Sequence, residues 1–190
     1  MNEQPSHKPI IVGIDPGLSG GIAAMTEDGR VLDVQPLPVL KSRNVGYDVQ
    51  ALCKWFADVT VDRCIAVVFI EKSAPRPTDS RSALYSCGYG AGQLAATVMV
   101  LGHGLAPGVN PATWRRTVLG PTLSHELSKT ESEAKRSARR RQLKLESIAY
   151  VKRQHPYASL RPTARCRVDS DGMAEAICIA EYGRRVHFAR

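Results

Sequence analysis

Several features that would place this chain in other classes of protein are missing from its sequence. The five cysteines are scattered and form no Cys-x-x-Cys pair, so neither a zinc site nor a disulfide framework is indicated, and a reducing compartment is expected. No run of residues approaches the ~20 apolar residues of a membrane span. The polar N-terminus, MNEQPSHKP, lacks an apolar signal region, so we expect neither secretion nor a membrane partner.

Acidic residues are in the minority. The chain carries 26 basic and 18 acidic residues, a net charge of +8 and a pI near 9.5, which suits a polyanionic partner. The cations are concentrated in KRSARRRQLK (135–144), where six of them follow one another without an acid. A merely basic protein with a solvated helix face remains an alternative.

The apolar patterns predict a single α/β domain over residues 1–190, with an ordered core at about 9–185. Strands are predicted at 10–15, 21–25, 30–37 and 64–71, with a short one at 105–111. Helices are predicted at 47–59, 80–102, 111–120, 129–149 and from about 169–172 to 182. The first three strands form an antiparallel meander, and the continuous apolar run at 64–71 indicates a central strand.

Carboxylates stand at the ends of two of these strands. Asp15 follows IIVGI and Glu71 follows CIAVVFI, so both side chains are expected at the carboxyl edge of the sheet. Asp171 opens the last helix, with Asp169 beside it. Carboxylates brought together repel one another, and a divalent cation such as Mg²⁺ relieves that repulsion. Two such ions catalyse phosphodiester hydrolysis, so acids on a basic chain predict a metal-dependent nuclease.

Each acid also has a simpler explanation. Asp15 precedes a proline and is a common turn former. Either Asp169 or Ser170 is suited to cap the last helix, where the helix dipole favours Asp171. The joint occurrence of these acids favours the site.

The ordered motifs GIDPGLSGGIA, VVFIEK, VNPATWRRTVLG, SKTESEAKRSARR and DGMAEAICIAEYG resemble the RuvC group of Holliday-junction resolvases, and more closely its phage and chloroplast type. The resemblance covers about residues 9–185. It implies a ribonuclease H-like fold, with a mixed five-stranded sheet and helices on both faces. It further implies a homodimer that uses helix 80–102, and paired symmetric nicks in four-way DNA junctions. The implied cofactor is two Mg²⁺ ions, with Mn²⁺ able to substitute. The implied location is a bacterial or phage-infected cytoplasm, or an organelle nucleoid.

The resemblance assigns the catalytic, metal-binding acids as Asp15, Glu71 and Asp171. The fourth family position falls on Val168 or Ser170, neither of which is an acid or a histidine, so Asp169 is the nearest substitute ligand. Glu175 lies one turn beyond Asp171 on the same helical face. Its role stays open between an acid that faces or supports the metal and a residue used for packing.

The resemblance also extends to the cations. Lys129 matches a lysine of the family's basic segment, where a cation near the scissile phosphate stabilises the transition state. The residues expected to contact DNA are Lys72, Arg76, Arg81, Arg115, Lys129, Arg136, Arg139 and Arg140. Tyr85 and Tyr89, four residues apart on a helix, suit either base stacking or a dimer interface.

Other functions fit parts of the sequence. A ribonuclease H-like nuclease with another substrate shares all of these features. A catalytically inactive junction-binding protein is suggested by Val168 and Ser170. The stretch GIDPGLSGG also resembles the phosphate loop of sugar-kinase and actin-like ATPases. That class needs a second nucleotide-binding lobe, for which 190 residues leave too little chain.

Overall fold

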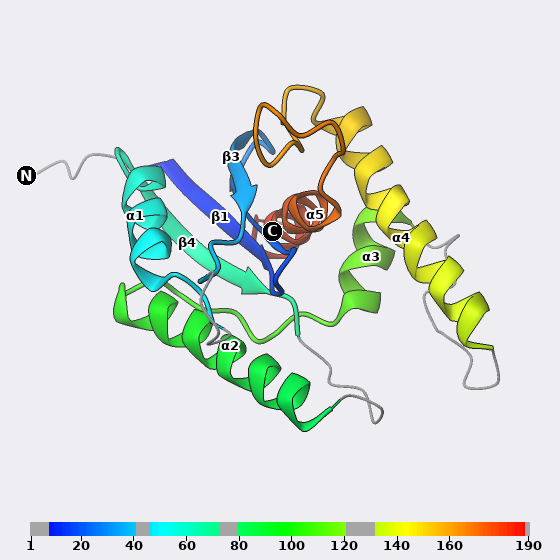
Figure 1. The fold of residues 1–190 in the computed structure, drawn as a ribbon. Helices are drawn as coiled ribbons and strands as arrows, with labels where there is room; N and C mark the ends of the chain where they lie inside the picture. The colour runs from blue at the N-terminus through cyan, green and yellow to red at the C-terminus, as the bar shows by residue number, and fades with distance from the viewer. Residues whose placement is uncertain (1–7, 41–45, 73–79, 121–131, 189–190) are drawn as a thin grey trace, which may run out of the picture.

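The computed structural model describes residues 8–40, 46–72, 80–120 and 132–188 (Figure 1). The strands are β1 (Lys8–Asp15), β2 (Gly21–Thr26), β3 (Val31–Pro36) and β4 (Arg63–Ile70). The helices are α1 (Val49–Val59), α2 (Arg81–Val100), α3 (Pro111–Leu119), α4 (Glu133–Gln154) and α5 (Asp171–Phe188). This is the α/β pattern that the sequence predicts.

The four strands form one mixed sheet in the order β3-β2-β1-β4. The pairs β3–β2 and β2–β1 are antiparallel, whereas β1 and β4 run parallel. Strand β1 lies between β2 and β4, and its residues from Ile10 to Ile14 are buried. The antiparallel meander is therefore confirmed. The prediction of a central strand at 64–71 is wrong among the strands that the structure describes, because β4 is the last strand in the order of the sheet and only Val68 and Phe69 are buried in it.

The predicted fifth strand is wrong for the part of the chain that the structure describes. Leu105 and Val109 make only isolated bridges, to Val68 and Glu71 respectively. Between them stands Pro107, which has no backbone N–H to donate to a strand partner. Segment 105–109 thus runs beside β4 and pairs with it at two points, but it does not form a continuous strand.

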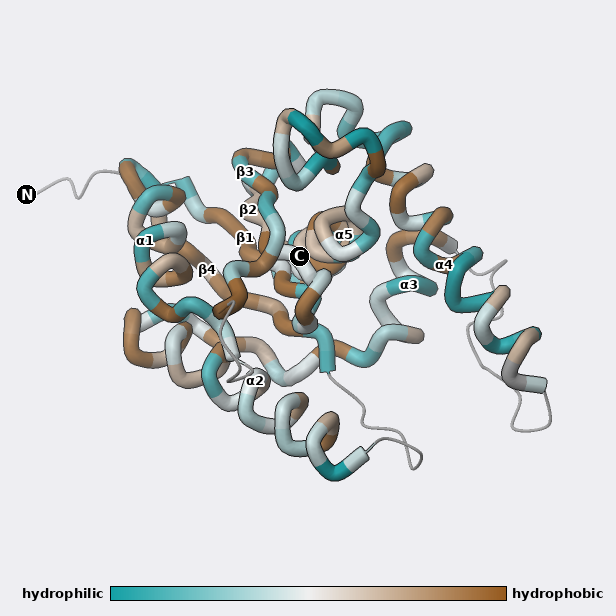
Figure 2. Tube along the Cα trace, viewed as in Figure 1, coloured by the Kyte–Doolittle hydropathy of each residue, from teal (hydrophilic) through white to brown (hydrophobic). Residues whose placement is uncertain are grey.

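Helices cover both faces of the sheet, as expected (Figure 1). On one face, α1 and α2 pack over a core that includes Val12, Ile14 and Phe56. On the other face, α5 lies against β1 and β2, with α3 and α4 packed beside it. Figure 2 shows apolar residues along the strands and α5, while α4 is largely hydrophilic. No described helix is long and apolar enough to cross a membrane.

Helix ends follow local capping chemistry. Ser80 Oγ accepts a hydrogen bond from Ala83 N–H, which starts α2 where the sequence predicts it. Helix α4 begins at Glu133, with Ser132 as its cap, and both α4 and α5 extend about a turn and a half beyond their predicted ends. All five cysteines are free thiols.

Candidate active site

Strand pairing brings two of the predicted acids to the same edge of the sheet. Asp15 is the last residue of β1, and Glu71 directly follows β4, the parallel neighbour of β1. The Glu71 N–H donates to the Ile14 carbonyl oxygen at 2.9 Å. Because parallel strands end at the same edge, both carboxylates lie where the sequence predicts them.

The start of α5 is held against that edge by close backbone packing. Gly20, in the turn after β1, bridges to Gly172 in the first turn of α5. A Cβ atom on Gly172 would lie within 2.7 Å of Gly20 Cα, so a larger residue here would push the two segments apart. This contact between glycines sets Asp171 beside the strand ends.

Four carboxylates share this place, which we call the acid cluster: Asp15, Glu71, Asp171 and Glu175. Burial raises the pKa of Asp15 well above its usual range, and the negative charges of Glu175, Glu71 and Asp171 add to that effect. Burial likewise raises the pKa of Glu71, with a smaller contribution from Glu175. The sequence left the role of Glu175 open, and the structure brings it into electrostatic contact with the other acids.

Two consecutive residues of α3 hold two of these carboxylates. Trp114 is fully buried, and its indole Nε1–H donates to Glu71 Oε2 at 2.6 Å. Arg115 Nη2 donates to Glu175 Oε1 at 2.7 Å. The sequence around Trp114 carries no local signal that the partner of its ring N–H is Glu71, 43 residues earlier in the chain.

Lysines of α4 hold the two aspartates near the start of α5. Lys144, from the basic run, forms an ion pair with Asp171, and this hydrogen bond raises the pKa of Lys144. Lys152 pairs with Asp169 at 2.5 Å. The two lysines are eight residues, or about 12 Å, apart along α4. Asp169 therefore points to a different part of α4 from Asp171.

The cap of α5 is provided by Ser170. Its Oγ accepts a hydrogen bond from Met173 N–H at 3.3 Å, which satisfies one of the free donors of the first helical turn. The capping explanation therefore applies to Ser170, and Asp171 is left free to face the cluster.

The donor atoms of the acid cluster suit a hard divalent cation, since carboxylate oxygens are the ligands that Mg²⁺ prefers. The raised pKa values of Asp15 and Glu71 reflect burial and repulsion, both of which such a cation would offset. Among the described residues, however, no three Asp, Glu, His or Cys side chains are grouped closely enough to hold a metal ion. Instead, Arg115 and Lys144 balance part of the negative charge.

No family model and no curated protein sequence matches the chain. Solved structures do match. Thermus thermophilus RuvC aligns with a TM-score of 0.58 and 14% identity, over 95% of this chain and 96% of that one. The same protein in complex with a Holliday junction substrate aligns with a TM-score of 0.57 and 13% identity, over 94% of this chain and 95% of that one. The yeast mitochondrial Holliday junction resolvase Ydc2 aligns with a TM-score of 0.50 and 13% identity, over 98% of this chain and 84% of that one.

The chain has a RuvC-like fold. The resemblance inferred from the motifs is thus confirmed for the fold, and the phage and chloroplast subtype stays a prediction. On the RuvC-like fold, the acid cluster lies where the carboxyl ends of the parallel strands β1 and β4 meet the start of α5.

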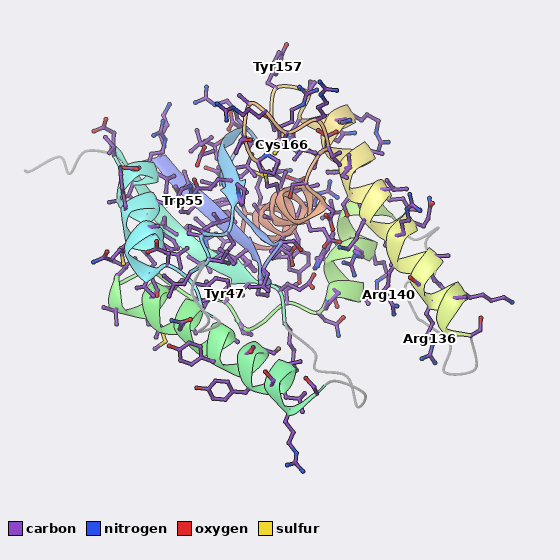
Figure 3. All side chains as sticks on the ribbon, in the orientation of Figure 1. Tyr47, Trp55, Arg136, Arg140, Tyr157 and Cys166 are labelled. Atoms are coloured by element: carbon purple, nitrogen blue, oxygen red, sulfur yellow. The ribbon has the colours of Figure 1, made fainter. Side chains whose placement is uncertain are left out.

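The predicted DNA-contacting residues other than Arg115 fall into three groups. Lys129 and Arg76 lie outside the described residues. Lys72 and Arg81 are exposed, and Lys72 directly follows Glu71 at the sheet edge. Arg136, Arg139 and Arg140 lie on α4, and Figure 3 shows Arg136 and Arg140 on that helix.

Arg115 differs from the other predicted DNA contacts. Its side chain is only 15% exposed and is directed to Glu175, not to solvent. Lys144 was not predicted as a site residue, although it belongs to the basic run. Lys144 is far from the acids in the sequence, so no local pattern indicated that the middle of α4 lies beside the start of α5.

Proposed function

We propose that this protein is a structure-selective DNA endonuclease that cuts four-way junctions with the help of a divalent cation. The observation that carries the proposal is the acid cluster, in which carboxylates from β1, the end of β4 and α5 meet at one edge of a RuvC-like fold. The basic helix α4 passes beside that cluster, with Lys144 in contact with Asp171.

In this proposal, Asp15, Glu71 and Asp171 would hold Mg²⁺, which Mn²⁺ could replace. When bound, a pair of such ions activates water and stabilises the leaving 3′ oxygen of the phosphodiester. Glu175 completes the cluster in place of Asp169, because Glu175 is electrostatically coupled to Asp15 and Asp169 pairs with Lys152. The Trp114 indole N–H donates a hydrogen bond to Glu71 Oε2, which leaves Glu71 Oε1 available to a ligand.

The cations of α4 supply the affinity for DNA in this proposal. Arg136, Arg139 and Arg140 would contact phosphates, which position the nucleic acid without reading its sequence. Lys72, next to Glu71 at the sheet edge, would meet the strands near the point of cleavage, and Arg81 would contact them from the start of α2. Lys129 would add a cation near the scissile phosphate.

Resolution of a junction needs two symmetric nicks, so we propose a homodimer with two-fold symmetry. Helix α2 offers a suitable surface, because Leu84, Tyr85 and Tyr89 are 41%, 71% and 46% exposed. The two tyrosine rings stack on each other, with centroids 5.9 Å apart. Exposed apolar side chains gathered on one helix are typical of a surface that is covered in an assembly.

A second candidate is a junction-binding protein without nuclease activity. It is favoured by the absence, within the part of the chain that the structure describes, of three side chains at metal-binding spacing. A ribonuclease H-like nuclease with a different nucleic-acid substrate would share the whole site.

Cleavage of end-labelled DNA separates these candidates. The protein would be incubated with a four-way junction or with a linear duplex of the same sequence, in Mg²⁺ or in EDTA. We expect paired nicks in the junction alone, and only in Mg²⁺. Binding of the junction without Mg²⁺-dependent cleavage would contradict the nuclease, and equal cleavage of the linear duplex would contradict the junction selectivity.

A further inference from the structure

A largely buried cation contacts one carboxylate of the acid cluster. Arg115 is 15% exposed and its partner Glu175 is 7% exposed, and their charged atoms are 2.7 Å apart. The guanidinium carbon lies 4.6 Å from the centroid of the Trp114 ring. Among the described residues, the buried Arg115 Nε has no hydrogen-bond partner. The guanidinium is therefore enclosed by the protein and is not a surface group that happens to reach an acid.

The other cation of the site is placed differently. The Lys144 side chain is 50% exposed, so water screens its attraction to Asp171. Arg115 is shielded from water, and its charge opposes the effect of burial on the pKa of both Asp15 and Glu71. A single guanidinium thus interacts with three carboxylates that come from β1, the end of β4 and α5.

Burial of a guanidinium is unfavourable unless carboxylates surround it, and burial of the carboxylates is unfavourable without a cation. The Trp114 side chain anchors α3 in the core and fixes the direction in which Arg115 leaves the helix. The position of the guanidinium is therefore set by the fold, before any ligand is present.

We propose that Arg115 is a resident counter-cation of the acid cluster. It holds Glu175 and the neighbouring carboxylates together before a divalent ion binds, and it then competes with that ion for the same negative charge. Arg115 is a positioning residue, because it acts through Glu175. The second part of the inference rests on the proposed function, since the competing ion is the proposed Mg²⁺.

The test uses the full chain and compares four variants with the wild type. Arg115→Met removes the charge and keeps most of the side chain's volume, and Arg115→Lys keeps the charge. The double variant Arg115→Met/Glu175→Gln removes both charges of the pair. Arg116→Met is the matched control, because it makes the same chemical change at an exposed position of the same helix. Melting temperature is measured in EDTA and over a range of Mg²⁺ concentrations, and Mg²⁺ binding is measured by calorimetry.

In EDTA, we expect Arg115→Met to lower the melting temperature by about 10 °C, because it leaves buried carboxylates uncompensated. The double variant should recover most of that loss, and Arg115→Lys should lie between the wild type and Arg115→Met. The half-saturating Mg²⁺ concentration of Arg115→Met should fall about tenfold, because the variant lacks the positive charge that repels a divalent ion bound by the same carboxylates. Arg116→Met should match the wild type.

Two results would overturn the inference. If Arg115→Met lowers the melting temperature equally in EDTA and in saturating Mg²⁺, and the double variant recovers nothing, Arg115 serves only for packing. If Arg115→Met binds Mg²⁺ as the wild type does, or more weakly, the competition is wrong. A wild type that binds no Mg²⁺ would overturn the competition and the proposed metal site together. In that case, the melting temperatures of the variants in EDTA still decide whether Arg115 acts as a counter-cation of the carboxylates.

Discussion

Gly13, in the middle of β1, determines how closely α5 approaches the sheet, so Gly13→Ala should damage both the fold and the site. A Cβ atom on Gly13 would lie 2.9 Å from Ala180 Cα and still closer to Ala180 N and to the carbonyl oxygen of Ala176. All three atoms belong to the backbone of α5. They cannot move aside as the end of a flexible side chain would, so the whole helix must shift.

The size of that shift follows from the contact distance. Carbon atoms pack at about 3.5–4.0 Å, so α5 must move away from β1 by about 1 Å. Overpacking of this kind destabilises by about 1–3 kcal/mol, which for a chain of this length lowers the melting temperature by about 6 °C. The same movement takes Asp171 and Glu175 away from Asp15. A misplacement of about 1 Å in a catalytic site lowers the rate about 100-fold.

Two measurements check this reasoning: thermal unfolding in EDTA, and the initial rate of Mg²⁺-dependent junction cleavage. Gly92→Ala on α2 is the control for stability, because nothing lies within 4 Å of its added Cβ and alanine favours a helix. Its melting temperature should equal or exceed that of the wild type. A Gly13→Ala variant with the wild-type melting temperature and rate would refute the close packing of α5 on β1.

Two further predictions concern charge. Because the pKa of Asp15 is raised by burial and by Glu175 and Glu71, its protonated form stabilises the fold, and that stability is lost as pH rises through the raised pKa. In EDTA, Asp15→Asn should therefore become more stable than the wild type above about pH 4, and the difference should grow with pH. Unfolding in urea at several pH values measures this, and parallel curves would contradict it. On α4, Arg139→Gln should reduce the slope of log affinity against log salt by about 0.9 if Arg139 contacts a phosphate. Fluorescence anisotropy with a labelled junction gives that slope, and an unchanged slope removes Arg139 from the interface.

The sequence predicted those parts of the site that depend on local pattern. An apolar run that ends in an acid places the carboxylate at a strand end, which is why Asp15 and Glu71 were predicted at the sheet edge. Asp171 was predicted from its place at the start of a helix, and α5 does begin there. The predicted fifth strand failed because Pro107 interrupts the run at 105–109, a local signal that the apolar pattern outweighed.

The other parts of the candidate site depend on how the helices are oriented towards one another, and short sequence patterns do not specify that orientation. The choice between Glu175 and Asp169 depends on the direction in which α5 leaves the sheet edge and on the pairing of Asp169 with Lys152. The sequence TWRR does not show which arginine faces inward. The complete burial of Trp114 fixes the rotation of α3 and turns Arg115, not Arg116, towards the acids.

The most direct test of the acid cluster is the rate of junction nicking in Mg²⁺ by the wild type, Asp15→Asn and Asp169→Asn. Asp15 lies among the other acids, whereas Asp169 is paired with Lys152 outside the cluster. We predict that Asp15→Asn binds the junction but does not cut it, and that Asp169→Asn cuts at close to the wild-type rate. Loss of cleavage in Asp169→Asn, or wild-type cleavage by Asp15→Asn, would contradict the acid cluster as the active site.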